Sequence, residues 1–331
     1  MRSFAYERPE SMDVAIARLA GHGDGSAVRP LAGGTDLLTL MKSDIVAPDT
    51  LIDIKRIPEL DDRIEATGDG TTVGALATLT QLEQHQDIRT RFPALAQAAG
   101  QSATPQLRNM ATLGGNVLQR PRCWYFRDPD IACWLKGGDS CPAREGENTH
   151  NAIFQDSPCV AVHPSDSAAV LIAYDARVRI RGRISERTVP IGDFFMMPTD
   201  GHRRENVLEP GELILGFTLP RPDDGARSVY LKAMDRKTWA FALVGVAVSV
   251  TIRDGTISDA RVVLGGVAPI PRRLMSVEQA LRGAIPDGAL FHRMAALALE
   301  DAQPLSRNTY KVDLARTMIE RALTAATMVV A

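Results

Sequence analysis

All cysteines of this chain lie in one stretch of the sequence, and no thiol occurs outside it: Cys123, Cys133, Cys141 and Cys159. Thiolates are the ligands that zinc and iron–sulfur clusters prefer, and four of them complete such a site. The spacing is neither the paired Cys-x-x-Cys of a zinc ribbon nor the tight run of a bacterial ferredoxin. Only a folded, loop-rich segment can therefore bring these sulfurs together.

Three interpretations of the four cysteines are open from the residues alone. We favour a four-cysteine iron–sulfur cluster, ahead of a structural zinc site and of scattered buried thiols or disulfides. Disulfides are disfavoured because a chain of 331 residues does not need covalent cross-links to hold its fold. We expect the segment to follow a strand that ends at Pro121 and to precede a helix that starts at Asp166.

The composition is that of a globular protein with a large core. Hydrophobic residues make up 45% of the chain, and the length predicts two or three domains. The net charge is −2 and the two signs are mixed throughout, so we expect no nucleic-acid partner. We also expect no membrane span and no export signal in this chain, because long apolar runs are absent. Synthesis is then cytoplasmic, and a signal-bearing partner could carry the folded chain to the periplasm.

The first predicted unit, residues 1–56, alternates helix and strand. Ser11 is typical of a helix N-cap, a glycine-rich turn is expected at 21–25, and short strands are expected at 27–31 and 50–54. This unit is predicted to be one small subdomain.

The second predicted unit, residues 57–222, contains the cysteine insert at 117–165. It opens with a hairpin that turns at Gly68-Asp69-Gly70, and helices are expected at 79–85 and 93–100. The third unit, 223–331, follows a run of prolines and charges that is typical of a linker. Its strands and helices are predicted at 228–234, 241–253, 256–265, 276–281, 289–302 and 312–325.

Two glycine pairs, Gly33-Gly34 and Gly114-Gly115, each follow apolar residues and precede a polar one. Glycine lets the backbone approach a ligand closely, and a following helix N-terminus favours a pyrophosphate. Most such pairs are only tight turns; two of them in an alternating chain strengthen the case for a nucleotide site but leave both interpretations open. Neither pair has the Rossmann fingerprint, which argues against an ordinary NAD domain. The histidines form no metal-binding or catalytic pattern, and no catalytic residue is predicted.

Taken together, these residues resemble the FAD-binding medium subunit of the molybdenum hydroxylase family, which includes xanthine dehydrogenase, aldehyde oxidoreductase and carbon monoxide dehydrogenase. The resemblance runs essentially end to end. The segments that carry it are Leu31-Ala-Gly-Gly-Thr-Asp-Leu-Leu38, Gln106-Leu-Arg-Asn109, Ala111-Thr-Leu-Gly-Gly-Asn116, His163-Pro-Ser-Asp166, Pro190-Ile-Gly-Asp-Phe-Phe195, Glu209-Pro-Gly-Glu-Leu213 and Tyr230 with Lys232.

The resemblance implies an α+β protein with a two-subdomain FAD-binding fold of the vanillyl-alcohol-oxidase (PCMH-like) type. A C-terminal α+β domain with a small antiparallel sheet and helices would follow. The resemblance implies that the glycine motifs wrap the pyrophosphate and ribityl chain of FAD, and that Asp166 and Lys232 lie near the flavin. The full set of FAD contacts that it implies is Pro30, Leu31, Ala32, Gly33, Gly34, Thr35, Asp36, Leu37, Ser102, Thr112, Leu113, Gly114, Gly115, Asn116, Asp166, Leu213 and Lys232.

Most family members lack the cysteine insert. Here it resembles the insert of the periplasmic aldehyde oxidoreductase flavoprotein subunit and, more distantly, that of 4-hydroxybenzoyl-CoA reductase; both carry an extra [4Fe–4S] cluster. The resemblance implies that the four cysteines ligate such a cluster. One departure lies at the flavin end, where Trp239-Ala-Phe241 replaces the acidic residue that often follows the Lys232-x-x-x-Arg236 pattern.

The sequence therefore predicts an FAD- and [4Fe–4S]-containing electron-transfer subunit of a heteromeric, molybdenum-dependent aldehyde oxidoreductase. A large molybdopterin subunit would oxidise the aldehyde, the [2Fe–2S] clusters of a small subunit would pass electrons to FAD, and an external acceptor would receive them. The alternatives are a subunit of a 4-hydroxybenzoyl-CoA-reductase-like or xanthine-dehydrogenase-like enzyme, or a zinc-binding interaction module. We expect loss of the cluster to affect FAD less than the insert, because both glycine motifs lie outside 117–165.

Overall fold

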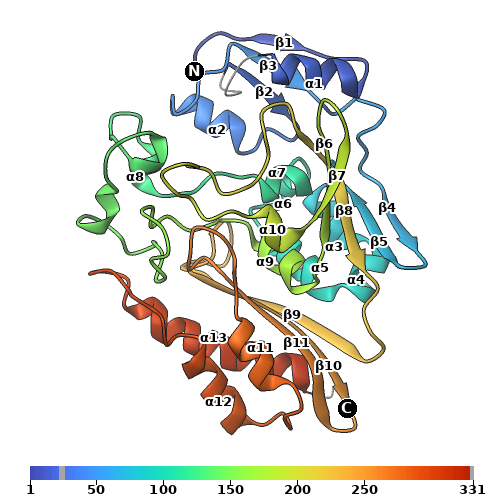
Figure 1. Ribbon diagram of the computed structural model, residues 1–331, viewed down its shortest axis with the longest axis vertical. Coiled ribbons are helices and arrows are strands. Elements are labelled where there is room, and N and C mark those ends of the chain that lie inside the picture. Colours follow the sequence, from blue (N-terminus) through green and yellow to red (C-terminus); the bar gives the residue numbers. More distant parts are fainter. Residues whose placement is uncertain (22–26, 329–331) are drawn as a thin grey trace.

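The computed structural model describes residues 1–21 and 27–328, which leaves most of the predicted turn at 21–25 outside the described residues. The strands of this described part form three sheets, which follow one another along the long axis of the molecule (Figure 1). The fold is α+β, as predicted, and its last sheet is small and antiparallel. No helix in the described ranges is long and apolar enough to cross a lipid bilayer.

The first sheet is parallel and lies at the N-terminal end of the molecule. Its order is β1-β3-β2, with strands β1 (Ala5–Glu7), β3 (Thr50–Asp53) and β2 (Val28–Leu31). Helix α1 (Met12–Ala20) buries Met12, Ala15, Ile16 and Leu19, and Ser11 caps it as predicted. Helix α2 (Leu37–Lys42) follows the first glycine pair, and Asp36 is the residue before its first turn. Strand β1 was not predicted, because three largely exposed residues give no periodicity.

The middle sheet has the order β4-β5-β8-β6-β7 and is antiparallel throughout. Its strands are β4 (Ile64–Thr67), β5 (Gly70–Gly74), β6 (Arg177–Arg181), β7 (Glu186–Pro190) and β8 (Leu213–Pro220). The helices of this part are α3 (Leu79–Gln84), α4 (Gln86–Arg91), α5 (Pro93–Gly100), α6 (Pro105–Arg108), α9 (Asp166–Ala173) and α10 (Ile191–Phe194). Helix α9 is buried on all sides, because it lies between this layer and the C-terminal sheet.

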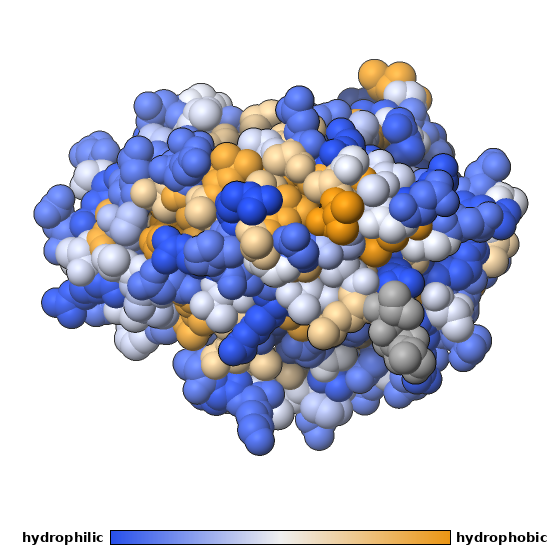
Figure 2. All heavy atoms as spheres, turned by 90° about the horizontal axis from the view of Figure 1, so that it is seen from below, coloured by the Kyte–Doolittle hydropathy of each residue, from blue (hydrophilic) through white to orange (hydrophobic). Residues whose placement is uncertain are grey.

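The C-terminal sheet has the order β12-β11-β10-β9. It consists of β9 (Ala226–Ala233), β10 (Val244–Arg253), β11 (Thr256–Gly265) and β12 (Arg272–Arg273). Asp254 and Gly255, which connect β10 to β11, both have positive φ, as a two-residue hairpin turn requires. The helices α11 (Met275–Leu281), α12 (Gly288–Leu297) and α13 (Tyr310–Thr327) form the end of the molecule (Figure 1). Viewed from this end, apolar side chains gather near the middle of a mainly hydrophilic face (Figure 2).

The cysteine insert contains only short helical turns over 118–165, all of which the structure describes. They are α8 (Trp124–Arg127) and the 3₁₀ turns η1 (Trp134–Lys136) and η2 (Pro142–Arg144). The predicted strand ending at Pro121 is wrong. The short helix α7 (Leu113–Val117) precedes the insert instead, because the Thr112 side chain caps its first turn by accepting from the Gly115 N–H.

Candidate cofactor site

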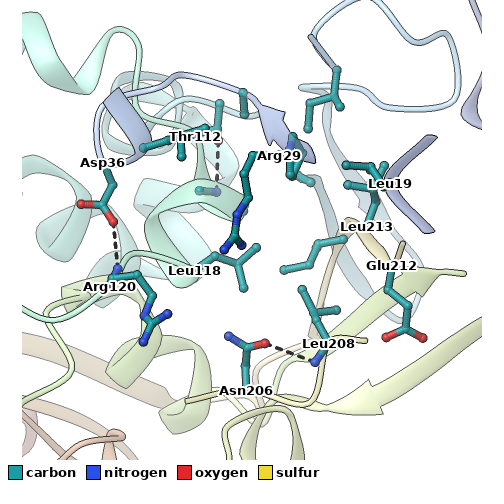
Figure 3. A pocket seen from close by; sticks show the side chains of 18 of the residues that line it. Leu19, Arg29, Asp36, Thr112, Leu118, Arg120, Asn206, Leu208, Glu212 and Leu213 are labelled. Atoms are coloured by element: carbon teal, nitrogen blue, oxygen red, sulfur yellow. Dashed lines mark hydrogen bonds between the residues drawn. The ribbon is translucent and has the colours of Figure 1, made fainter. Parts of the chain in front are cut away.

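A pocket of about 320 Å³ lies between the first glycine loop, the start of α7 and the segment 204–214 (Figure 3). Most of the predicted FAD contacts in the two glycine motifs line it, together with Leu213. The predicted residues on its wall are Pro30, Ala32, Gly33, Gly34, Thr35, Asp36, Leu37, Thr112, Gly114, Gly115 and Leu213. Leu31, Leu113 and Asn116 do not line the pocket; Leu113 is fully buried in the core beneath it.

The first glycine loop presents unused backbone donors to this pocket. Among the described residues, the N–H groups of Gly33, Gly34 and Thr35 have no hydrogen-bond partner. Gly34 has a φ of +71°, a conformation that favours glycine and turns successive N–H groups to one side. Such an arrangement is suited to an anion such as a pyrophosphate.

The lack of a side chain at Gly33 is required by a contact within the protein. A Cβ atom at this position would lie 1.8 Å from the Met110 carbonyl oxygen, where no side chain fits. The first loop therefore packs directly on the backbone that leads into the second glycine motif. The sequence argument for Gly33, close approach of a ligand, missed this role.

The second glycine motif has fewer free donors than its sequence suggests. The Gly114 N–H donates to the Ala75 carbonyl at 3.0 Å, and the Gly115 N–H donates to Thr112 Oγ1 at 3.1 Å. A Cβ on Gly115 would meet only Thr112 Oγ1, at 3.0 Å, and would otherwise face the pocket. The second motif therefore contributes backbone without side chains to the pocket wall, whereas the first motif contributes free N–H donors.

Charged residues that the sequence did not single out line the same pocket. Arg29 comes from β2 and Arg120 from the start of the insert (Figure 3). Glu205 comes from the segment before β8. Arg120 Nε lies 3.2 Å from Glu205 Oε2. Burial raises the pKa of Glu205, and the Arg120 guanidinium offsets only part of that effect. No sequence motif marks these positions, since only the chain path brings them together.

A second pocket, of about 310 Å³, lies between the insert, the start of α9 and the β9–β10 connection. Asp166, Trp239 and Phe241 line it, and so does Cys123. The two pockets flank α7. Gly115 lines the first pocket. The next residue, Asn116, accepts a hydrogen bond of 2.6 Å from the Oγ of Ser165, which lines the second pocket.

Asp166 is the centre of a buried polar network beside the second pocket. Lys232 Nζ donates to Asp166 Oδ2 at 2.8 Å, Ser102 Oγ donates to the same oxygen at 3.1 Å, and the Tyr230 hydroxyl donates to Oδ1 at 2.5 Å. Burial, reinforced by the Asp166 charge, raises the pKa of Tyr230. The structure thus brings the predicted residues Ser102, Asp166 and Lys232 together. The cap of α9 is Ser165 rather than Asp166, which is the first helical residue.

All four cysteines are free thiols, and they converge on one region of the insert. Cys133 and Cys159 are buried with Leu40 and Phe126, while Cys123 and Cys141 pack against the same cluster. Burial raises the pKa of Cys159 most strongly, and the other three sulfurs add to that effect, so all four lie within electrostatic range of one another.

Several N–H groups point at these sulfurs. The Ala161 N–H donates to Cys159 Sγ at 3.4 Å, and Asn151 Nδ2 donates to Cys123 Sγ at 3.8 Å. Donors of this kind stabilise thiolate ligands in metal and iron–sulfur sites. Within the described residues, no group of three or more His, Cys, Asp or Glu side chains is arranged to hold one metal ion.

Comparisons with known proteins agree with this architecture. The family model described as the FAD binding domain in molybdopterin dehydrogenase matches residues 2–222. The model described as the CO dehydrogenase flavoprotein C-terminal domain matches residues 229–326.

The chain is 37% identical to the aldehyde oxidoreductase FAD-binding subunit PaoB of Escherichia coli (strain K12), over 98% of each chain. It is 32% identical to the carbon monoxide dehydrogenase medium chain of Hydrogenophaga pseudoflava, over 98% of this chain and 96% of that one. The solved carbon monoxide dehydrogenase from the same organism superimposes with a TM-score of 0.78 at 29% identity, over 98% of this chain and 97% of that chain. The chain therefore belongs to the molybdenum hydroxylase family, as an FAD-binding medium subunit and thus the flavoprotein subunit of an oxidoreductase.

Proposed function

We propose that this protein is the FAD- and [4Fe–4S]-containing electron-transfer subunit of a molybdenum-dependent aldehyde oxidoreductase. The observation that carries the proposal is the position of the four free thiols: Cys123 lines the second pocket, and Leu40 and Phe126 of the cysteine cluster line the first. The site that would hold iron thus borders both pockets that would hold FAD. The likeness to an aldehyde oxidoreductase subunit supports the substrate class.

FAD would extend across α7 from one pocket to the other. Its pyrophosphate would accept hydrogen bonds from the N–H groups of Gly33, Gly34 and Thr35. Asp166 would then border its flavin end in the second pocket, and Lys232, which does not line that pocket, would act through its hydrogen bond to Asp166. When bound, FAD supplies the capacity to exchange electrons one or two at a time. The chain's own residues would bind it, orient it and fix the charge around it, so no acid, base or nucleophile is assigned.

The donor chemistry of the insert fits an iron–sulfur cluster. Cys123, Cys133, Cys141 and Cys159 would hold it, and the donors Ala161 N–H and Asn151 Nδ2 would lower the charge on the sulfurs. Four thiolates would equally suit a single zinc ion, so the proposal of a cluster rests on the likeness of the insert and is decided by metal analysis.

The complex would contain two further subunits and an external acceptor. A large molybdopterin subunit would oxidise the aldehyde, and [2Fe–2S] clusters on a small subunit would deliver its electrons to FAD. The names of the relatives support an assembly of this kind, since they are medium chains and FAD-binding subunits. We propose synthesis in the cytoplasm, with export to the periplasm in company with a signal-bearing subunit.

The purified full-length chain provides the test. We expect a flavin absorption spectrum, about one FAD per chain, and about four irons and four sulfides per chain after anaerobic reconstitution. Co-expression with molybdopterin and [2Fe–2S] subunits should give aldehyde-dependent reduction of the flavin. A colourless chain that carries one zinc and no flavin would overturn the proposal in favour of a zinc-binding interaction module.

A further inference from the structure

Helix α2 follows the first glycine loop and contacts the cysteine insert through Asp36 at its start and through Leu40. Asp36, at its start, has no capping hydrogen bond of its own, although helix-starting aspartates commonly cap. Its Oδ2 instead accepts from the Arg120 N–H at 2.8 Å, and its Oδ1 accepts from Arg127 Nη2 at 2.9 Å and from Arg122 Nη1. All three arginines belong to the segment that leads into and follows Cys123.

The Asp36 contact is mostly shielded from solvent, with 15% of that side chain exposed. Burial alone would raise the pKa of Asp36, but Arg122, Arg127 and the Arg120 N–H together hold it below its usual value. Arg127 also donates to the backbone carbonyls of Pro121 and Arg120, at 2.8 and 2.9 Å. The carboxylate therefore fixes the backbone on both sides of the first cysteine.

A second, apolar connection runs along the same helix. Leu40 of α2 and Phe126 of α8 are buried against Cys133 and Cys159. The same two side chains also line the first pocket. Leu40 and Phe126 therefore belong both to the wall of this pocket and to the cysteine cluster.

We propose that Asp36 couples FAD binding to the state of the cysteine cluster. The cluster would fix Phe126 and the arginine segment, and these would hold the first glycine loop, with its free N–H groups, in the geometry that binds the pyrophosphate. This inference rests on the proposed function, since it needs both cofactors. It adds to the expectation from sequence that loss of the cluster affects FAD less than the insert, because residues 118, 120 and 126 of the insert line the pocket.

Coupling of this kind is reciprocal and measurable as a ratio of affinities. The dissociation constant of FAD is measured by flavin fluorescence on flavin-free full-length protein, with the iron–sulfur cluster present and after its removal by oxidation and chelation. In the wild type we expect removal of the cluster to weaken FAD binding about tenfold. In Asp36→Asn, which keeps the shape but not the charge, the ratio should fall to about twofold or less.

A matched control is Asp156→Asn. Asp156 also joins the insert to another part of the chain, through Arg272, but it lines neither pocket. This variant should keep the wild-type ratio. Arg127→Gln is the second variant, and it removes one partner of the Asp36 carboxylate without touching the glycine loop. Far-ultraviolet circular dichroism confirms that each variant is folded.

The outcomes separate the two proposals. A wild-type chain that binds no FAD or no iron contradicts the proposed function itself. If the chain binds both cofactors but its FAD dissociation constant is the same with and without the cluster, the coupling alone is contradicted. The same holds if Asp36→Asn and Arg127→Gln keep the wild-type ratio of dissociation constants.

Discussion

Lys232 Nζ lies 2.8 Å from Asp166 Oδ2, and the two side chains are 1% and 5% exposed. The pair joins two parts of the molecule, because Asp166 begins α9 and Lys232 belongs to β9 of the C-terminal sheet. Tyr230 and Ser102 donate the remaining hydrogen bonds to the carboxylate. Loss of one partner would leave the other charge buried without compensation.

Replacing Asp166 with Asn should therefore lower the free energy of unfolding by about 3 kcal/mol or more. Urea unfolding of the flavin-free chain measures this change. The control Asp313→Asn, which breaks the exposed pair with Arg316, should have little effect. The double variant Asp166→Asn/Lys232→Met should recover part of the loss; equal unfolding midpoints for all variants would contradict a buried, coupled pair.

Gly115→Val should remove FAD while the fold survives. Its side chain would extend into the first pocket and meet only Thr112 Oγ1 in the protein. Gly33→Val should instead lower stability as well, because its Cβ would collide with the Met110 carbonyl. Gly68→Val, in open space, is the control. Flavin content and thermal unfolding distinguish the three, and full flavin occupancy in Gly115→Val would show that the pocket assignment is wrong.

Replacing any one of the four cysteines with Ser should lose or degrade the proposed cluster. Thiolate ligation would supply part of the folding energy of a loop-rich insert. The insert should nevertheless stay attached, since Asn308 Nδ2 donates to the carbonyls of Asn151 and Ala152. Iron and sulfide analysis with electron paramagnetic resonance of the reduced chain measures the loss, and Ser140→Ala, beside Cys141, is the control. An unchanged signal in all four variants would exclude these ligands.

Lys311 predicts a pH dependence of stability. Its Nζ is buried and donates to the carbonyls of Gly266, Asn151 and His150, at 2.6, 2.9 and 3.3 Å. Burial lowers the pKa of Lys311 to about 7, whereas a lysine in an unfolded chain has a pKa of about 10.4. Between these values the unfolded chain binds a proton that the folded chain has released. The free energy of unfolding should therefore rise with pH across this window, by an amount of the order of 3 kcal/mol.

The comparison of wild type with Lys311→Met isolates this contribution. Urea unfolding at pH 7 and pH 9.5 should show the rise in the wild type and in the exposed-lysine control Lys42→Met, but not in Lys311→Met. If the three carbonyls keep the ammonium charged at pH 9.5, the wild type and Lys311→Met will change in parallel, and the prediction is wrong.

Local signals in the sequence located most regular elements. Helix α9 begins at Asp166, as predicted, and the hairpin at Asp254-Gly255 has the positive φ angles that its residues favour. The prediction of a strand ending at Pro121 was wrong. The Thr112 side chain caps the turn that begins at Leu113, and this hydrogen bond favours a short helix over a strand in the apolar run.

The sequence alone determined which chemical groups are available. It contains two glycine loops, four thiols in one stretch with no cysteine elsewhere, and a pattern of residues that is specific to one family. It could not show that Gly33 packs on Met110, that Ser102 and Tyr230 donate to Asp166, or that Arg29, Arg120 and Glu205 share a pocket. These relationships join positions far apart in the chain, and they depend on how whole helices and sheets pack. Periodicity and turn chemistry report only on near neighbours, so only the tertiary structure could place the cysteine insert against the wall of the first pocket.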